Sequence, residues 1–279
     1  MQVGIGLPST VPGTTGATLC EWARRADAGP FSTLGVLDRL RYDSVDPFVA
    51  LAAAAAVTER IGLATTIAIG PLRRAAMLAK EAASVHALAP GRMTLGLAVG
   101  ARPDDYEVAE AAYENRGTAL SRELAYLRGP FDSAGIGPAT KFGAGGIPVL
   151  IGGAGGAALT RMARYADGYV HGGGPPRAFA SAATKARAAW RDLDRPGEPV
   201  LWGQGYVALG DADRGRDYLL DYYAFTGPFA ARIAAGVLTD ADSVRDFVRG
   251  YAGEGCDELL LFPTTGDPDE VDRLAEILS

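Results

Sequence analysis

Two glycine-rich stretches of this sequence have the pattern best suited to hold a phosphate. The first directly follows the apolar run Pro148–Ile151 and leads into a segment with helical spacing. Glycine lets the backbone approach a ligand closely, and the free N–H groups at a helix N-terminus attract negative charge. Such a turn can hold a phosphate without a lysine, although it can also be a tight connection that binds nothing. Its residues are Gly152, Gly153, Ala154, Gly155 and Gly156.

The second stretch, His171 to Gly174, comes directly after the next apolar run, Gly168–Val170. Glycine-rich turns at neighbouring strand ends can together form a phosphate cradle, so Gly172 and Gly173 join the candidate binding residues. Because His171 stands beside these glycines at a strand end, it is a candidate catalytic side chain, with simple packing as the equal alternative.

Metal chemistry is not indicated by the remaining ionisable residues. His86 lies in an apolar helical stretch, where packing or surface exposure is the simpler interpretation. Two histidines cannot build a multi-histidine centre. The pair Asp104-Asp105 could hold magnesium, but charges at the start of a helix are the simpler interpretation. We therefore predict no metal site.

Motifs for other phosphate or nucleophilic chemistry are missing. The sequence contains no Gly-Lys-Ser/Thr phosphate loop and no GxSxG nucleophile elbow. The glycines around Gly96 and Gly100 do not form a dinucleotide fingerprint that opens a helix.

Two further clusters have both a functional and a structural interpretation. Arg73-Arg74 could receive an anionic group, with an exposed loop pair as the default interpretation. Tyr222-Tyr223 and Phe225 either close over an aromatic substrate or pack against the fold.

These residues are positioned by short runs rich in Val, Ile and Leu that alternate with Ala-rich stretches of helical spacing. Alternating strands and helices without a long linker give either one parallel barrel or one doubly wound sheet, and eight strands favour the barrel. We predict an α/β fold, a single (β/α)8 TIM barrel over residues 1–279, with its chemistry where the strands end. The expected strands are Val3–Leu7, Thr33–Leu37, Ile61–Ile69, Met93–Val99, Pro148–Ile151, Gly168–Val170, Leu201–Leu209 and Glu258–Phe262.

Some of the connecting stretches are less regular than the strands. Asp104–Arg128 is expected to be one helix, whereas Arg216–Gly236 is poorly defined. The helix Asp46–Thr58 is expected to open with an aspartate N-cap followed by Pro47. The segment Gly129–Gly146 is rich in Gly, Pro and Ala, and is either a lid or a long connector.

The net charge and the absence of targeting signals limit the partners and the cellular location expected for this protein. The net charge of −6 argues against nucleic acid or an anionic membrane as partner, because both favour a basic face. The first residues lack the basic start and apolar core of a signal peptide, and the apolar run Ala50–Val57 is too short to cross a bilayer. Cys20 and Cys256 have no metal-ligand or redox spacing. We expect a soluble, cytoplasmic protein with reduced cysteines.

The motifs taken together resemble the bacterial luciferase-like monooxygenase superfamily of flavin- and deazaflavin-dependent oxidoreductases. Within the signature region, Gly91-Arg92 and Leu95-Gly96 stand where the family pattern has "GR" and the following "LG" strand. The resemblance covers nearly the whole chain. The segments that carry it are Gly35–Arg39, Ile61–Tyr106, Ile151–Tyr169 and Cys256–Pro263.

The resemblance implies a flavin or deazaflavin ring lying across the mouth of the barrel. Its phosphate would contact the backbone of Ala154–Gly156, with Gly172–Gly174 nearby, and Gly100 at the end of the fourth strand belongs to the same binding set. In several relatives a non-proline cis peptide on the third strand supports the ring. The matching bond here is Thr66–Ile67.

Two departures from the family pattern concern acid–base chemistry. Many relatives have histidine directly after the aspartate that ends the second strand, where this chain has Arg39. The deazaflavin-dependent sugar dehydrogenases use a glutamate after the fourth strand, and the corresponding place here is close to Ala101. Arg39 is permanently cationic and cannot act as a general base, but it can stabilise negative charge on a reduced flavin or an enolate substrate. Arg39 and His171 are the catalytic candidates.

The expected function is a luciferase-like monooxygenation that uses reduced FMN and O2 on a small organic substrate, with a separate flavin reductase among the expected partners. The first alternative is hydride transfer with coenzyme F-420. An alternative of another class is a non-catalytic flavin-binding barrel, and a phosphate-binding isomerase or lyase is a further one by fold analogy. The resemblance also implies a homodimer.

Overall fold

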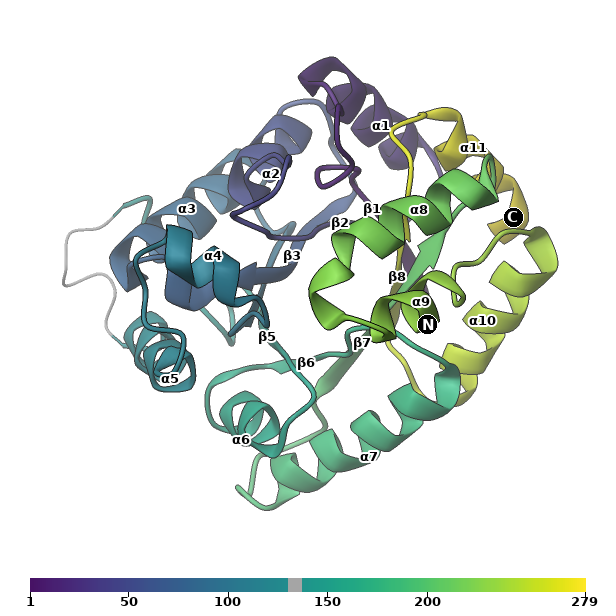
Figure 1. The fold of residues 1–279 in the computed structure, drawn as a ribbon. Coiled ribbons are helices and arrows are strands. Elements are labelled where there is room, and N and C mark those ends of the chain that lie inside the picture. Colours follow the sequence, from purple (N-terminus) through teal and green to yellow (C-terminus); the bar gives the residue numbers. More distant parts are fainter. Residues whose placement is uncertain (130–136) are drawn as a thin grey trace.

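Eight parallel strands close into a barrel in a computed structural model, which describes residues 1–129 and 137–279 (Figure 1). Each strand pairs with its neighbours in chain order, and β1 pairs with β8 to complete the ring. The predicted (β/α)8 barrel is therefore confirmed, and the doubly wound alternative is wrong because a doubly wound sheet stays open. The strands are β1 Gln2–Gly6, β2 Thr33–Val36, β3 Gly62–Ile69, β4 Met93–Ala98, β5 Val149–Gly152, β6 Gly168–Val170, β7 Val200–Val207 and β8 Glu258–Pro263.

Helices surround the barrel, and two short 3-10 turns, η1 and η3, complete the described elements (Figure 1). The helix that follows β2 begins as predicted, because the carboxylate of Asp46 accepts hydrogen bonds from the N–H groups of Phe48 and Val49. The elements are α1 Gly16–Ala28, α2 Pro47–Ala55, η1 Gly70–Leu72, α3 Ala75–Leu88, α4 Pro103–Val108, α5 Arg116–Leu127, α6 Gly156–Tyr165, α7 Pro176–Arg191, α8 Ala212–Tyr222, η3 Ala224–Thr226, α9 Phe229–Ala234, α10 Ala241–Gly253 and α11 Asp269–Leu278.

The apolar core has two layers that follow from strands covered on both faces. Outward-facing strand residues and the inner faces of the helices form one large cluster. A smaller cluster forms from buried side chains of five strands, and large rings such as Trp202 and Phe262 fill it. The barrel is therefore a packed scaffold, and ligands must bind at its rim.

The predicted helix Asp104–Arg128 is wrong as a single element. The structure has two helices, α4 and α5, separated by a break in which Glu110 adopts a positive φ of 51°. A side chain other than glycine rarely adopts this conformation, and it cannot continue a right-handed helix.

The poorly defined stretch Arg216–Gly236 is ordered. It consists of the end of α8, then η3 and α9. In Figure 1 these elements lie in front of the strands, over the mouth of the barrel. Part of the predicted lid or connector, Gly129–Gly146, lies outside the described residues. In its described part, Phe142 forms an isolated parallel bridge with Ile147.

No helix in the described ranges combines the length and the apolar character needed to pass through a membrane.

Close strand packing makes a specific stability prediction at Gly96, which lies in β4. A Cβ added there would stand 2.2 Å from the carbonyl oxygen of Thr65, a backbone atom that cannot rotate away. We expect Gly96→Ala to lower the free energy of unfolding by about 3 kcal/mol, the upper part of the usual range for overpacking. Chemical denaturation monitored by circular dichroism measures this.

The matched control is Gly16→Ala at the start of α1, where an added Cβ meets nothing within 4 Å. This variant should match the wild type or exceed it by less than about 1 kcal/mol. Equal denaturation midpoints for the two variants would contradict the packing of β3 against β4.

Candidate active site

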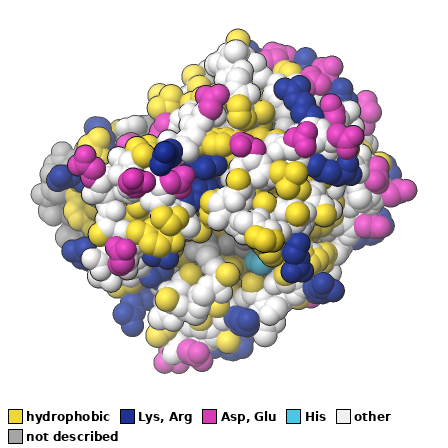
Figure 2. Space-filling view, in the orientation of Figure 1, with side chains coloured by type: hydrophobic (Ala, Val, Ile, Leu, Met, Phe, Trp, Pro, Cys, Tyr) yellow, Lys and Arg dark blue, Asp and Glu magenta, His cyan; other side chains and the backbone are white. Residues whose placement is uncertain are grey.

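A cavity of about 440 Å³ lies at the carboxyl ends of β6 and β7. Gly172–Gly174 and Gln204 form part of its wall on the barrel side, while Tyr223, Phe229 and Phe247 belong to the helical segments that cover it. Figure 2 shows the same face of the molecule hollowed near its middle, with apolar and basic side chains around the hollow. This is the rim at which (β/α)8 barrels carry their active sites.

Gln204 connects this cavity to the third strand. The side chain is buried and lines the cavity, and its Nε2 donates a hydrogen bond of 2.5 Å to the carbonyl oxygen of Thr66. The peptide bond Thr66–Ile67 is cis, which confirms the expectation drawn from the family resemblance. The Ile67 side chain lies against Gly152, where an added Cβ would stand 3.1 Å from Cγ2 of the isoleucine. The fold thus brings together two predicted cofactor-binding residues, Ile67 on β3 and Gly152 on β5.

The turn Gly152–Gly156 has the features expected of an anion site. Gly155 is the N-cap of α6, and no side chain in the described part of the chain caps this helix. A Cβ added at Gly155 or Gly156 would meet nothing within 4 Å, so the backbone of the turn is open to a ligand. The hydroxyl of Tyr169 donates to the carbonyl of Gly153 and so fixes the turn to β6. The turn is not part of the cavity wall, whereas Gly172 and Gly173 are.

His171 follows β6, at the start of the second glycine-rich stretch. Its ring contacts Phe179 edge-on at a centroid distance of 5.9 Å, and its Nε2 atom is buried with no hydrogen-bond partner. Burial lowers the pKa of the imidazole, so it is neutral near pH 7. The side chain itself does not line the cavity.

Arg39 is joined at the rim by a second arginine, which the sequence analysis did not single out within its strand-end segment. Arg102, which precedes α4, is 8% exposed and donates to the carbonyl of Tyr222 at 3.4 Å. The Arg39 side chain is 10% exposed and donates to the same carbonyl at 3.2 Å. The pair is formed by the fold, because Tyr222 comes from α8 and each arginine follows a different strand. Gly100, two residues before Arg102, has a positive φ of 67° and packs beside Ile69.

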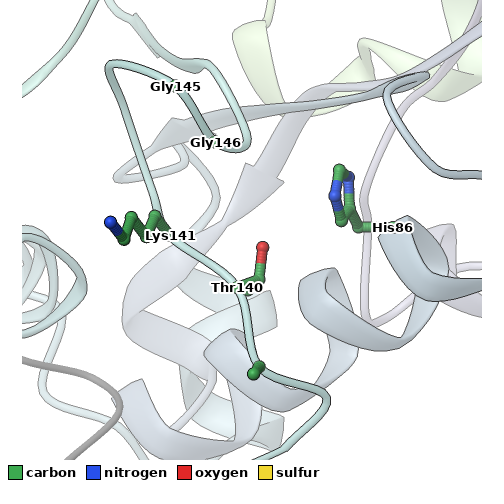
Figure 3. Close-up of a pocket in the computed structure, with 6 residues that line it drawn as sticks. His86, Thr140, Lys141, Gly145 and Gly146 are labelled. Atoms are coloured by element: carbon green, nitrogen blue, oxygen red, sulfur yellow. The ribbon is translucent and has the colours of Figure 1, made fainter.

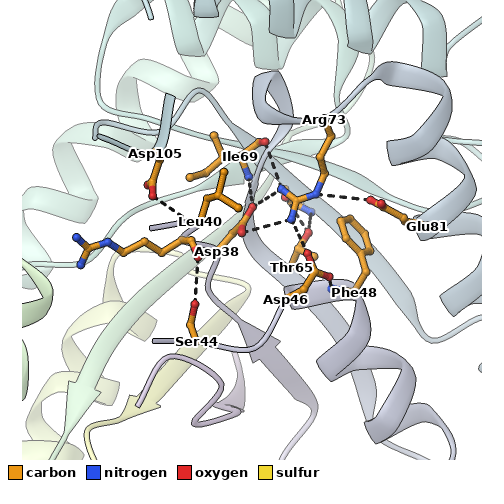
Figure 4. A network of polar contacts seen from close by, with 12 residues as sticks. Asp38, Leu40, Ser44, Asp46, Phe48, Thr65, Ile69, Arg73, Glu81 and Asp105 are labelled. Atoms are coloured by element: carbon orange, nitrogen blue, oxygen red, sulfur yellow. Dashed lines mark hydrogen bonds and ion pairs between the residues drawn. The ribbon is translucent and has the colours of Figure 1, made fainter. Parts of the chain in front are cut away.

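The interpretation of Arg73 as an exposed loop residue is wrong. Its side chain is 14% exposed and forms ion pairs with Asp38 at 2.5 Å, with Asp46 at 2.8 Å and with Glu81 at 3.6 Å (Figure 4). Burial acts to lower the pKa of Arg73, and the carboxylates of Asp38 and Asp46 outweigh it and raise that pKa. Asp38 also accepts a hydrogen bond from the N–H of Ile69, so the network joins the end of β2 to the end of β3.

Glu123 is a further buried acid, on α5, that the sequence did not single out. It is 6% exposed, and its Oε2 has no hydrogen-bond partner. The carboxyl packs against Gly70, where an added Cβ would be 2.5 Å from Oε2. Burial raises its pKa to about 7, with Arg122 opposing the shift. The sequence did contain a signal for this acid. Glu123 lies four residues after Ala119 and four residues before Leu127, which places it on the inner, apolar face of the helix.

A second pocket lies around His86 (Figure 3). His86 is in the last turn of α3, which returns from the carboxyl end of β3 towards the amino end of β4. The pocket is therefore remote from the rim that carries the glycine-rich turns. Lys141 and Thr140 are among its other lining residues.

A model of the family described as luciferase-like monooxygenase matches residues 1–271 of the chain. Among curated proteins, the uncharacterized protein Rv0940c of Mycobacterium tuberculosis (strain H37Rv) is 36% identical over 143 residues. The match covers 47% of this chain and 49% of the relative, so the chain spans about half the length of the curated relatives it matches.

Solved structures share the fold over the whole chain. An F-420-dependent secondary alcohol dehydrogenase has a TM-score of 0.78 at 15% identity, covering 99% of this chain and 97% of the other. The EDTA monooxygenase of Chelativorans sp. BNC1 has a TM-score of 0.74 at 17% identity, covering 100% of this chain and 93% of the other. At these identities the similarity shows the fold alone.

The pKa of Glu123 predicts how stability depends on pH. Its folded pKa of about 7 lies above the ordinary 4.5, so between these values the folded protein keeps a proton that the unfolded chain releases. The contribution of the Glu123 carboxyl to the free energy of unfolding is therefore complete below pH 4.5 and decreases as the pH rises from 4.5 to 7. Above pH 7 it does not change further. We expect Glu123→Gln, which stays neutral, to be about 2 kcal/mol more stable than the wild type at pH 8.

Denaturant unfolding at pH 5 and pH 8 measures this difference. The control is Glu107→Gln on α4, whose carboxylate belongs to a side chain that is 78% exposed. That variant should follow the wild type at both values. A Glu123→Gln variant that is less stable than the wild type at pH 8 would contradict the raised pKa of Glu123.

Proposed function

The chain belongs to the luciferase-like monooxygenase family, and from this premise we propose that it is an oxidoreductase that holds a flavin-type cofactor at the mouth of its barrel. The observation that carries the proposal is the open glycine turn at the uncapped start of α6, beside a second glycine stretch that lines the cavity. Backbone N–H groups and the helix dipole bind a phosphate at such a turn, and the adjacent space receives the attached ring.

The residues fit both the phosphate and the ring of such a cofactor. Gly155 and Gly156 offer N–H groups with no side chain in the way. The cavity of about 440 Å³ falls within the usual size range of small-molecule sites, roughly 300–1,000 Å³. Gln204 and Tyr206 supply polar atoms at its wall, which orient a ring that presents donors and acceptors.

We propose reduced FMN and O2 as the first assignment, with a small organic molecule as the substrate and a separate flavin reductase as the source of electrons. The bound flavin would supply the redox chemistry, and the protein would supply orientation and exclusion of water. The cap formed by α8, η3 and α9 serves the second role. It is held to the barrel by the hydrogen bond between the hydroxyls of Tyr206 and Tyr223, at 2.7 Å.

Coenzyme F-420 is the second candidate, and the reaction would then be hydride transfer to or from a small substrate. The similarity in fold to an enzyme named as F-420-dependent favours testing it. The rival from another class is a barrel that binds the cofactor without turnover. Oxidation or reduction of any substrate with a stoichiometric change in the bound cofactor would exclude that rival.

The phosphate assignment predicts the behaviour of Gly156→Asp. A Cβ added at Gly156, the first position of α6, meets nothing within 4 Å, and an acid there stabilises a helix by roughly 0.3–1 kcal/mol. It also places a negative charge at the proposed phosphate site. We expect the dissociation constant for FMN or coenzyme F-420 to rise at least about tenfold, a change of about 1.4 kcal/mol, in a fluorescence titration.

Two controls distinguish the contribution of the phosphate to binding from that of the ring. Gly156→Ala should bind the cofactor as the wild type does, and riboflavin, which lacks the phosphate, should bind equally to the wild type and to Gly156→Asp. Tight FMN binding alone supports the first assignment, and tight F-420 binding alone supports the second. If neither binds to the wild type, the proposed function is wrong.

A further inference from the structure

We propose that Arg39 and Arg102 form a subsite for the carboxylate of an organic substrate. This inference rests on the proposed function, because it assigns a substrate class to the same active site. It starts from two guanidinium groups that lie at the rim, one after β2 and one after β4, and that the fold brings to a single point.

Both arginines are buried with donors that have no partner. The Arg39 side chain is 10% exposed and Arg102 is 8% exposed. The Nε atom of each is buried and makes no hydrogen bond. An unpaired donor on a buried cation costs free energy, so each of these groups calls for a partner such as a ligand or a water molecule.

The charges around the pair do not balance. Asp104 lies 3.6 Å from Arg39, and its side chain is 32% exposed. Arg102 has no carboxylate within ion-pair distance in the described ranges of the chain. Both cations instead share one neutral acceptor, the carbonyl of Tyr222 at the end of α8. Two buried guanidinium groups thus have one ion-paired carboxylate, that of Asp104. The buried carboxylate of Asp105 accepts hydrogen bonds from the backbone N–H groups of Leu40 and Arg41, so room for one more negative charge remains at the pair.

The surroundings select an organic anion. The Arg102 guanidinium lies 4.3 Å from the Phe225 ring and 4.6 Å from the Tyr222 ring, and that of Arg39 lies 4.3 Å from the Tyr42 ring. These rings offer apolar surface to the carbon skeleton of a ligand, while paired guanidinium groups match the planar geometry of a carboxylate. The glycine turn after β5 has its own donors, so the cofactor phosphate does not need this pair.

The pair is also next to the proposed cofactor cavity. Tyr223 lines that cavity, and the centre of its ring is 5.9 Å from the Arg102 guanidinium carbon. Neither arginine lines the cavity itself, so a substrate whose carboxylate is held by the pair would have to extend past the Tyr222–Phe225 segment to reach it. The competing explanation is structural, namely that the arginines only cap the C-terminus of α8.

The test uses Arg102→Met, which keeps an unbranched apolar side chain in place of the arginine stem and removes the guanidinium and its charge. Acetate, benzoate and 2-naphthoate are titrated into the protein with and without cofactor, and the melting temperature is followed, with benzamide as the neutral match for benzoate. We expect at least one carboxylate to stabilise the wild type and benzamide to have no effect. Arg102→Met should bind that carboxylate at least about tenfold more weakly, as expected for loss of a charge-assisted hydrogen bond.

Two comparisons make the result specific. Arg245→Met on α10 removes a charge from a side chain that is 48% exposed, and should respond as the wild type does. The affinity of Arg102→Met for the cofactor should stay within twofold of the wild type. If no carboxylate binds, if benzamide matches benzoate, or if Arg102→Met retains full carboxylate affinity, the subsite is refuted. Failure of FMN and coenzyme F-420 to bind would instead refute the proposed function, since carboxylate binding is also measured without cofactor.

Discussion

Closure of the parallel sheet is the constraint on which the site depends. Because β1 pairs with β8, all the strands run in one direction around a ring, and every carboxyl end lies on the same rim. Residues far apart in the sequence then meet across the barrel. Gln204 on β7 reaches the carbonyl of Thr66 on β3, a separation of 138 residues. A sheet with open edges would place these strands apart, so the cavity wall exists only because the barrel is closed.

Two groups of buried arginines at this rim differ in how their charge is balanced. Arg73 is surrounded by three carboxylates, and its network fixes the ends of β2 and β3 relative to each other. Arg39 and Arg102 share a backbone carbonyl and one ion-paired carboxylate, that of Asp104, and they retain unpaired donors. A structural ion pair is most favourable when its partners compensate the loss of hydration. The contrast within one molecule therefore separates a charge used for architecture from charges that suit a ligand.

Local patterns in the sequence were sufficient for the strands, the glycine turns and the N-cap of α2, because each depends on neighbouring residues. The cis bond at Thr66 came from family resemblance, since no local property of Thr-Ile indicates it. Arg102 and Gln204 were not singled out individually because their roles arise from contacts with distant elements. Arg73 was misjudged for the same reason, as the acids around it come from three separate segments.

The side chains of the cavity wall bear on the role of the proposed cofactor. Its described side chains include no carboxylate, histidine, cysteine or lysine. Burial raises the pKa of Tyr206 and of Tyr223, so both hydroxyls keep their protons near neutrality, and Arg232 is a permanent cation. None of these groups can act as a general base at pH 7. The proposed cofactor would supply the reactivity at this wall, while the protein would position the reactants and set the local charge.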